Sequence, residues 1–305
     1  MNIVISGASG LVGTALQERL RAEGHSVTNL VRKAPSNANE SQWDPVAGTI
    51  DTDVIAQADA VINLSGAGIG DRRWSQSYRK TLLDSRTLTT SLLASTLASL
   101  ANNGTQRTLL NSSAIGIYGA RGDEEITESS EHGDGFLADI CLEWEAATTP
   151  AQEAGVRVVH LRTGIVMSKR GGVLKKLLPL FKLGLGGRLG SGRQWQSWIS
   201  IDDEVGAIVH LLSTSTEGAV NLTAPNPVTN KEFTAALGKA VRRPTIFSVP
   251  GFAPKLLVGS QFAEELLKEN QEEMTTLDKL ENATRLYDLA KSKTMPKDFI
   301  LLLLN

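Results

Sequence analysis

The feature that most constrains this chain is a set of three glycines between a short apolar run and a helical pattern near the N-terminus. Residues 2–6 are apolar and largely β-branched, which is typical of a strand buried on both faces of a parallel sheet. Gly7, Gly10 and Gly13 follow, and residues 11–23 carry apolar side chains at helical spacing. Glycine at these positions permits a tight turn, close approach of the backbone to a pyrophosphate and close packing of the helix on the strand. The order therefore predicts a dinucleotide-binding turn; the alternative is an ordinary glycine-rich turn.

Strand and helix patterns alternate over the first 165 residues. Strands are predicted at 26–31, 59–64, 108–112 and 156–161, and helices at 76–100 and 136–154. This alternation is typical of a doubly wound parallel sheet. We therefore expect an α/β protein with an NAD(P)-binding Rossmann fold and a smaller C-terminal region that forms a cap over the substrate.

The second half of the chain is expected to complete both regions. Residues 195–201 are predicted to return to the sheet, 202–212 and 231–241 to form helices, and 220–222 to form the last strand. Residues 263–293 are charged and helix-prone. The dinucleotide-binding domain is therefore predicted at 1–165 plus about 195–225. The cap region is predicted at about 166–194 plus 226–305.

Composition restricts the class of protein. The 305 residues include 31 Lys and Arg against 33 Asp and Glu, a net charge of −2 that provides no overall attraction for nucleic acid. One cysteine cannot form an internal disulfide or a cysteine-based zinc site, and the four histidines show no metal-ligand spacing. No run approaches the roughly 18–20 apolar residues of a membrane-spanning helix. We expect a cytoplasmic protein with a small-molecule substrate and without a metal, a membrane or a nucleic acid as partner.

The end of the second predicted strand indicates which dinucleotide is bound. NAD-binding folds usually place an acidic residue there, which contacts the ribose hydroxyls. This chain has Arg32 and Lys33 instead, two cations at the position of a 2′-phosphate. The pair predicts NADP(H) in preference to NAD(H); the alternative is a solvated basic pair at the end of a strand.

Several short blocks extend the pattern from Met1 to about Leu267. They are 61–69, 72–74, 85–86, 112–119, 144–145, 161–166, 184–198, 201–203, 221 and 224–225. With the glycine motif, these blocks resemble the extended short-chain dehydrogenase/reductase superfamily. Within it, the chain is similar to the atypical NAD-dependent epimerase/dehydratase group, the epimerase family proteins, which are related to sugar-nucleotide epimerases.

The resemblance implies cofactor contacts at the ends of successive strands. The pyrophosphate would lie on the glycine turn, the adenosine phosphate after strand 26–31, and the ribose and diphosphate along the residues after strand 59–64. The nicotinamide would lie after strand 108–112, and residues after strand 156–161 would close over its carboxamide. In that order, the implied residues are Gly7, Ser9, Gly10, Leu11, Val12 and Gly13; Arg32 and Lys33; Asn63, Leu64, Ser65 and Gly66; Ser112 with Ser113; and Thr163, Gly164 and Ile165.

The catalytic pattern of the superfamily is incomplete in this chain. Active members combine a serine with a Tyr-x-x-x-Lys pair on one helical face, in which the tyrosine transfers the proton and the lysine lowers its pKa. Ser113 matches the serine, which would hydrogen-bond the developing oxyanion. Leu137 stands at the tyrosine position and Cys141 at the lysine position, and neither side chain can perform that chemistry. The remaining candidates for proton transfer are Tyr118 and Asp139, together with Ser113.

Two functions remain open. The first is an NADP(H)-dependent oxidoreductase or epimerase with a substituted proton donor, acting on a carbonyl or sugar-nucleotide-like substrate, since hydride transfer itself needs only the cofactor. The second is a non-catalytic NADP(H)-binding redox sensor or regulatory protein. We expect the substrate site between Ser113 and the loop 184–198. The tail 268–305 departs from the basic, proline-containing and aromatic-rich ending usual in the group.

Overall fold

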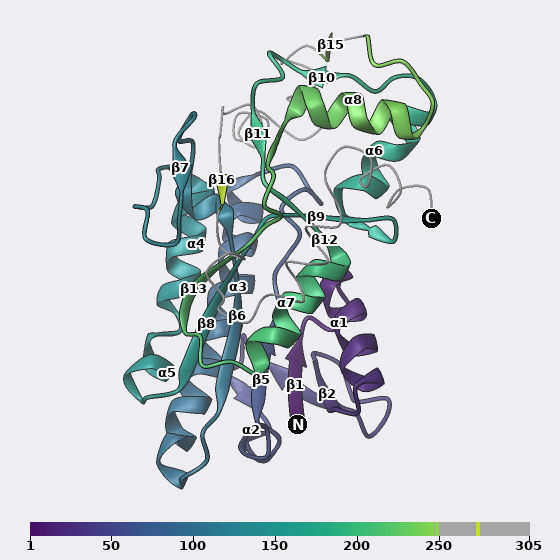
Figure 1. Ribbon diagram of the computed structural model, residues 1–305. Coiled ribbons are helices and arrows are strands. Elements are labelled where there is room, and N and C mark those ends of the chain that lie inside the picture. The colour runs from purple at the N-terminus through teal and green to yellow at the C-terminus, as the bar shows by residue number, and fades with distance from the viewer. Residues whose placement is uncertain (247, 250–272, 275–305) are drawn as a thin grey trace.

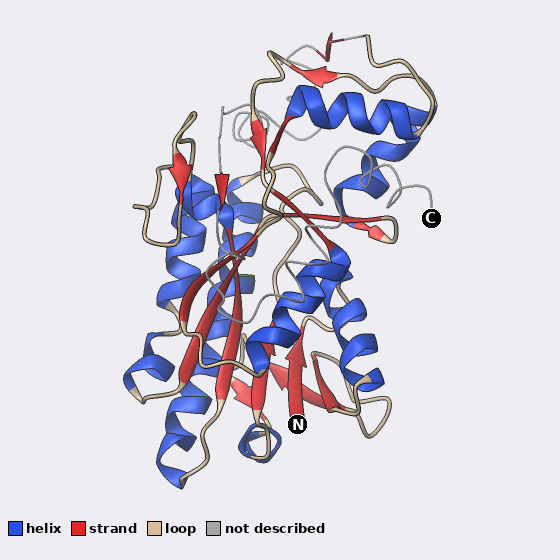
Figure 2. Cartoon of the chain, in the orientation of Figure 1, coloured by secondary structure: helices blue, strands red, loops and turns tan. Residues whose placement is uncertain are grey.

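The computed structural model describes residues 1–246, 248–249 and 273–274. Its centre is an eight-stranded sheet in the order β13-β8-β6-β5-β1-β2-β3-β4, with helices on both faces (Figures 1 and 2). All neighbours in this sheet are parallel except β4, which runs antiparallel to β3. The strands are β1 (Asn2–Ser6), β2 (Ser26–Val31), β3 (Glu40–Asp44), β4 (Thr49–Ile50), β5 (Ala60–Asn63), β6 (Thr108–Ala114), β8 (Arg157–Thr163) and β13 (Gly218–Leu222). The predicted doubly wound α/β fold is confirmed.

The two faces of this sheet explain why its central strands read as apolar runs. Helices α1 (Leu11–Ala22) and α7 (Ile201–Leu212) pack on one face, and α2 (Thr52–Ala56), α3 (Gln76–Leu100) and α5 (Thr149–Glu153) pack on the other. In β1, Ile3 and Ile5 are buried against the first face and Val4 against the second. Alternate residues of the strand must therefore all be apolar.

The prediction of one continuous helix at 136–154 is wrong, because this stretch forms two helices. Helix α4 (Phe136–Ala146) ends before Thr148, whose hydroxyl donates to the Glu145 carbonyl at 2.7 Å, and α5 begins with Pro150 in its first turn. Proline lacks the N–H that a continuous helix needs and is favoured at a helix start. Strands β3 and β4 and helix α2 were not predicted from the sequence, because in β3 only Ser41 and Trp43 are buried and the intervening residues are polar.

A smaller group of elements lies beyond the carboxyl ends of the parallel strands (Figure 1). Its apolar cluster is formed by α6 (Gly172–Lys182), α8 (Asn230–Ala240), β9 (Ile165–Ser168), β12 (Trp198–Ser200) and β14 (Val228–Thr229). Short ladders join β9 to β12, β11 (Trp195–Gln196) to β14, and β10 (Arg188–Leu189) to β15 (Ser248–Val249). Strand β7 (Glu125–Ile126) pairs with β16 (Glu273–Met274). We call α6, α8, β9 to β12 and β14 the cap elements.

The expected return of residues 195–201 to the central sheet is wrong, since β11 and β12 pair with β14 and β9 instead. The chain leaves the sheet at Gly164, whose N–H donates to the Leu222 carbonyl, while the N–H of Ile165 donates to Ser197. A Cβ on Gly164 would lie 2.8 Å from the Ser197 carbonyl oxygen, so the crossing requires glycine.

The domain limits given above stay a prediction. Apart from 273–274, the tail 268–305 and most of the helix-prone stretch 263–293 lie outside the described residues.

Candidate functional site

The turn between β1 and α1 is built in a way that only glycine permits. Gly7 has a φ of +71°, and a Cβ on it would lie 2.4 Å from the Leu64 carbonyl oxygen. A Cβ on Gly13 would lie 2.4 Å from the Gly7 carbonyl oxygen, which itself accepts the Gly10 N–H at 3.0 Å. The turn is therefore packed against the residue that follows β5 and against its own helix, and it is exposed at Gly10.

The N-terminus of α1 is open to an anion. Helices α3, α7 and α8 begin with side-chain caps from Ser75, Ser200 and Thr229. Helix α1, like α6, begins at a glycine without a side-chain cap and has no acidic residue in its first turn. Thr14 supplies an N–H to Gly10, so the N–H groups of the preceding helical residues have no acceptor within the helix. Unpaired N–H groups and the positive end of the helix dipole favour a phosphate at this position.

Two exposed cations follow β2, the strand beside β1. Arg32 and Lys33 are exposed, and Arg32 makes no hydrogen bond or ion pair with any part of the chain that the structure describes. Lys33 acts on Glu40, whose pKa is lowered first by hydrogen bonds from Ser36 and further by the lysine charge. This edge therefore presents positive charge that the protein leaves largely uncompensated.

Asn63, implied above as a cofactor contact, has a different place. Its side chain is fully buried at the end of β5. Its Oδ1 accepts from the hydroxyl of Ser6 at 2.5 Å, and its Nδ2 donates to Thr90 at 2.9 Å and to Asn111 at 2.7 Å. The amide thus joins β1, β5, β6 and α3 and has no surface for a ligand. The Asn63 side chain is therefore occupied by protein partners, and the residues that follow it, Leu64, Ser65 and Gly66, are at least partly exposed. The contact of these four residues with the cofactor stays a prediction.

An arginine to which the sequence analysis gave no role, although it belongs to the block 85–86, lies beneath this loop. The side chain of Arg86 on α3 is 7% exposed, and its guanidinium lies 4.9 Å from the centre of the Trp144 ring. Its Nη1 donates to the Leu82 carbonyl at 2.9 Å, and a Cβ on Gly66 would lie 3.3 Å from its Cζ. Burial lowers the pKa of Arg86. A signal was present in the sequence, because an arginine stands on the helical stripe of α3 that is otherwise buried and uncharged: Leu82, Arg86, Thr90, Leu93 and Leu97.

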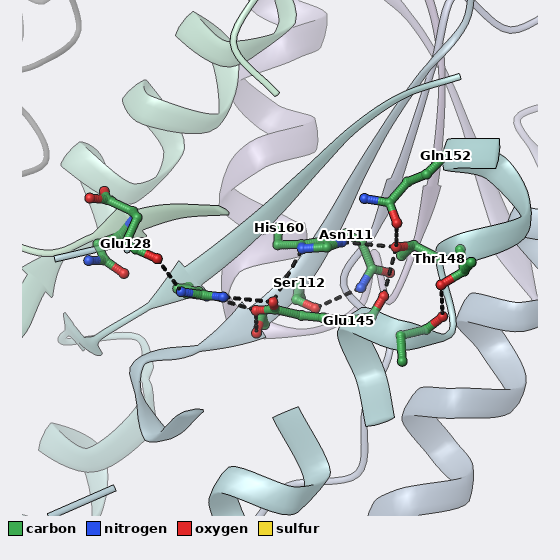
Figure 3. A network of polar contacts seen from close by, with 12 residues as sticks. Asn111, Ser112, Glu128, Glu145, Thr148, Gln152 and His160 are labelled. Carbon is green, nitrogen blue, oxygen red and sulfur yellow. Dashed lines mark hydrogen bonds and ion pairs between the residues drawn. The ribbon is translucent and has the colours of Figure 1, made fainter. Parts of the chain in front are cut away.

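Ser113 belongs to a polar group that we call the Glu145 cluster: Ser113, Tyr118, Glu145, His160 and Arg162. Figure 3 labels Glu145 and His160 of this network. The Ser113 hydroxyl donates to Glu145 at 2.6 Å, Arg162 donates to both carboxylate oxygens at 2.9 and 2.8 Å, and His160 Nδ1 lies 3.3 Å away. Burial by itself raises the pKa of Glu145, but the hydrogen bonds and charges of Arg162 and His160 outweigh it and bring the pKa to about 2. Glu145 is therefore ionised and fully paired.

The three catalytic candidates are not brought together at an open site. Ser113 is 4% exposed and its proton is directed to Glu145. Tyr118 is fully buried, donates to Asn221 at 2.7 Å and accepts from Arg162 at 2.8 Å; burial raises the pKa of its phenol. Asp139 is exposed on α4, two residues and hence about 200° from the buried Cys141. In this conformation Ser113 and Tyr118 are buried and engaged by other side chains, and the assignment of all three as proton donors stays a prediction.

The other predicted residues lie around the carboxyl ends of β6 and β8. Ser112 alternates with Ser113 and so faces the opposite side of β6. Thr163, Gly164 and Ile165 are partly exposed, and the Thr163 hydroxyl donates to Glu204 at 2.9 Å. Their contact with a cofactor stays a prediction.

Glu204 is a second site residue that the sequence reasoning missed. It is 2% exposed in the first turn of α7, its Oε2 has no hydrogen-bond partner in the described structure, and burial raises its pKa to about 8. The acid is therefore mostly protonated at neutral pH. Within the sequence it is one of three consecutive acids at a helix start, a pattern that ordinarily indicates solvent exposure and dipole stabilisation.

The two positions that depart from the superfamily pattern lie on the inner side of α4. A Cβ on Gly116 would lie 3.6 Å from the Cβ of Leu137, so this leucine packs near the end of β6. Cys141 is 4% exposed, and burial raises the pKa of its thiol to about 12. Cys141 is therefore neutral at physiological pH and carries no charge of either sign.

The described residues contain neither a membrane span nor a metal cluster. None of the helices in that part of the chain is both long and apolar enough to cross a membrane. No group of three or more His, Cys, Asp or Glu side chains there is arranged to hold a metal ion.

Comparisons with a family model, with related sequences and with solved structures all identify the same family. Residues 3–223 match the model of the NAD dependent epimerase/dehydratase family. The chain is 47% identical over 264 residues to epimerase family protein ML0860 of Mycobacterium leprae, covering 86% of this chain and 84% of that protein. It is 33% identical over 272 residues to human epimerase family protein SDR39U1, covering 88% and 90%. The crystal structure of the human protein (isoform 2) with NADPH has a TM-score of 0.81 at 30% identity, covering 99% of this chain and 98% of that chain. This chain therefore belongs to the NAD dependent epimerase/dehydratase family and has its nucleotide-binding fold.

Proposed function

We propose that this protein binds NADP(H) in preference to NAD(H), with the diphosphate on the glycine turn and the 2′-phosphate on Arg32 and Lys33. The observation that carries the proposal is the charge at the edge of the sheet: two exposed cations and no acid follow directly after β2, beside a helix N-terminus that no side chain caps. An arginine can hold a phosphate with two parallel hydrogen bonds. The NADPH in the structure of the human relative supports the same assignment.

The proposed reaction class is oxidation and reduction, or epimerisation, of a carbonyl or sugar-nucleotide-like substrate. The cofactor, when bound, supplies hydride transfer, and the chain supplies position and environment. The glycine turn orients the diphosphate, and residues 163–165 bound the site on the β8 side. The cap elements pack their own apolar cluster beyond the strand ends, where they shield a reacting carbonyl from water. Ser113, Tyr118 and Asp139 stay the candidate proton donors for chemistry of this class, and Ser113 and Tyr118 would exchange their present partners Glu145, Asn221 and Arg162 for the substrate.

The second candidate function is a non-catalytic NADP(H)-dependent sensor. It is favoured by one specific observation on the inner side of α4: the Leu137 side chain has no ionisable proton to transfer, and Cys141 is a buried neutral thiol. A protein that only reports cofactor binding needs neither a phenol nor a lysine at these positions.

The cofactor preference is tested by fluorescence titration of the full chain with NADPH and with NADH. We expect NADPH to bind more tightly. Arg32→Ala should weaken NADPH about 10- to 100-fold, since a charge-assisted hydrogen bond contributes about 1.5–3 kcal/mol, and should leave NADH unchanged. Lys80→Ala, which removes an exposed cation on α3, is the matched control and should change neither affinity. Equal affinities of the parent protein for NADPH and NADH overturn the preference, and no binding of either overturns the cofactor proposal.

Enzyme and sensor are separated by following NADPH absorbance with a panel of small carbonyl compounds and nucleotide sugars. Turnover that is lost in Gly13→Ala, where the added Cβ meets the Gly7 carbonyl, supports the enzyme. Tight NADPH binding without hydride transfer to any member of the panel supports the sensor.

A further inference from the structure

We propose that the outer end of the cap elements, where the C-terminal ends of α6 and α8 meet, docks onto an anionic membrane surface. Exposed leucine and isoleucine side chains enter the headgroup region there, and lysine and arginine side chains contact the lipid phosphates. Figure 1 shows α6 and α8 at the end of the molecule opposite α2. The proposal goes beyond the proposed function and does not depend on it.

Exposed apolar side chains gather at this end of the molecule. Seven large apolar side chains are exposed among the described residues, and four of them are Leu180, Leu183, Leu185 and Ile246. Leu183, Leu185 and Ile246 are 73%, 62% and 80% exposed. Single exposed apolar residues are ordinary, whereas a group of them in one part of the surface marks a contact with another molecule or with a membrane.

Positive charge is concentrated in the same region. Residues 169–193 and 230–246, which include α6 and α8, contain eleven Lys and Arg and one acid, Glu232. The rest of the chain has 20 Lys and Arg against 32 Asp and Glu, so the net charge of −2 is the sum of a basic cap and an acidic remainder. The expectation that no membrane is a partner rested on the lack of a spanning apolar run, which a protein held at the membrane surface does not need.

The cations and the leucines share one face of α6. Lys175, Lys182 and Leu183 are exposed and lie within about 100° of one another around the helix axis, on the side opposite the buried residues of α6. Arg243 brings the end of α8 to this face, because its Nε donates to the Lys182 carbonyl at 2.9 Å, and Ile246 follows three residues later. We call this group the cap patch: Lys182, Leu183, Leu185, Arg242, Arg243 and Ile246.

The cations of this face are not compensated within the described residues. Lys175, Lys182 and Arg243 form no ion pair there, whereas the neighbouring Lys176 lies 3.4 Å from Asp71. A cation at the C-terminus of a helix is stabilised by the helix dipole, which accounts for part of this charge. The dipole does not account for leucines exposed beside the cations. A bilayer accounts for both, since its headgroups carry negative charge above an apolar interior.

Arg242 indicates that positive charge is kept here at a cost to the fold. Its φ is +55°, the one positive φ of a non-glycine residue in the described part of the chain, and it follows the C-cap of α8. Glycine is usual at this position because a Cβ is strained in the left-handed conformation. Helix stability alone therefore favours glycine at 242, and the arginine is accounted for by a role of its charge outside the fold.

Other occupants fit the cap patch less well. A second copy of the chain that docks through the same patch brings like charges together. A nucleic acid engages the cations but leaves the leucines exposed to water. An acidic protein surface engages both and is one outcome of the test. A fluid bilayer is favoured because Lys182 and Arg243 have long side chains that reach headgroups while the leucines beside them insert.

The test is sedimentation of the full chain with lipid vesicles. Two kinds are used, phosphatidylcholine alone and an equal mixture of phosphatidylcholine and phosphatidylglycerol, and labelled poly-L-glutamate serves as a soluble acidic surface. The variants are Leu183→Ser with Leu185→Ser, Lys175→Gln with Lys182→Gln, and Arg242→Gly. Val46→Ser, 84% exposed between β3 and β4, is the matched control for the leucines, and Lys80→Gln on α3 is the control for the lysines. Thermal unfolding is measured on every variant.

The parent should bind the mixed vesicles, bind phosphatidylcholine at least tenfold more weakly, and dissociate as salt is added. The two lysine substitutions should weaken binding about 25-fold, about fivefold per cation. The two leucine substitutions should weaken vesicle binding about tenfold or more and leave poly-L-glutamate binding unchanged. Arg242→Gly should weaken vesicle binding about fivefold while it raises the unfolding temperature by about 2 °C, a combination that a purely structural role does not give. The two controls should change vesicle binding less than twofold.

A parent chain that does not bind the mixed vesicles overturns the proposal. Full vesicle binding by a folded leucine variant, or poly-L-glutamate bound as tightly as the vesicles, overturns the membrane as the partner and favours an acidic protein. Arg242→Gly carries the test if the leucine variant does not fold, because this variant is expected to be more stable than the parent. Unchanged vesicle affinity of Arg242→Gly overturns the role of the cap patch.

Discussion

The Glu145 cluster and the edge formed by the glycine turn, Arg32 and Arg86 lie at the same carboxyl end of one sheet, but they treat charge in opposite ways. In the cluster, one carboxylate accepts from Ser113 and twice from Arg162, so every charge has a partner. Along the open edge, the helix N-terminus, an exposed arginine and a buried arginine face no carboxylate among the described residues. Paired charges stabilise the fold, whereas unpaired charges at a built position indicate where a ligand completes the structure.

The largest effect expected from this contrast is on stability. Glu145→Ala leaves Arg162 and His160 buried without their carboxylate, and breaking a buried pair in this way costs about 3–5 kcal/mol. Urea unfolding of the purified variant should show this loss as a lower midpoint with an unchanged slope. Glu143→Ala, on an exposed position of the same helix, is the control and should leave the midpoint within the error of measurement. A Glu145→Ala protein as stable as the parent would contradict the structural role of the cluster.

Two adjacent serines of β6 face different surroundings: Ser113 belongs to the Glu145 cluster, and Ser112 faces the opposite side of the strand. Ser113→Ala removes one charge-assisted hydrogen bond to Glu145, which corresponds to about 1.5–3 kcal/mol of unfolding free energy. NADPH affinity should not change, because the hydroxyl is directed into the cluster. Ser112→Ala, one residue away on the other face, should change stability by about 0.5 kcal/mol or less. The assignment of Ser113 to the cluster fails if its alanine variant keeps full stability but loses hydride transfer or cofactor affinity.

These serines also show where sequence reasoning succeeds and where it stops. The glycine turn and six of the eight sheet strands, all but β3 and β4, were predicted because their signals are local: a spacing of three residues, and short apolar runs bounded by turns. Ser112 and Ser113 were both correctly placed at the end of a strand. Which of them faces the cofactor depends on the face of the strand, and the partner that engages Ser113 stands 32 residues away.

Other differences between the sequence-based expectations and the structure also arise from contacts between residues that are distant in the sequence. Residues 195–201 have a strand-like composition, but composition does not indicate whether β12 pairs with the central sheet or with β9. The family resemblance implied a cofactor contact at Asn63, whereas the burial of its side chain follows from Ser6, Thr90 and Asn111, which only the folded sheet brings together. Arg86 was visible on an apolar helical stripe, whereas its position under Gly66 depends on the packing of α3 against the loop after β5.

Glu204 is buried like the cluster but unpaired like the open edge, and it gives the most specific prediction. It is buried like Glu145, but it has a single hydrogen bond, from Thr163, and no cation beside it among the described residues. Burial therefore dominates and raises its pKa to about 8, from the 4.5 of an unperturbed glutamate. Between these two values the folded protein retains a proton that the unfolded chain releases. Stability is therefore fully present below pH 4.5 and falls as the pH rises toward 8.

Glu204→Gln removes this titration while it keeps the shape of the neutral acid. The difference in unfolding free energy between variant and parent should grow in favour of glutamine by about 1 kcal/mol per pH unit between pH 5 and 8, and should be constant below pH 4.5. Glu145 cannot produce this change, because its lowered pKa places its own stabilising effect above pH 4.5 and its loss toward pH 2. Asp202→Asn, an exposed acid in the same first turn, should leave the pH dependence unaltered. Parallel pH profiles of Glu204→Gln and the parent would show that Glu204 is ionised in the fold and that a cation outside the described residues, or a solvent path, compensates it.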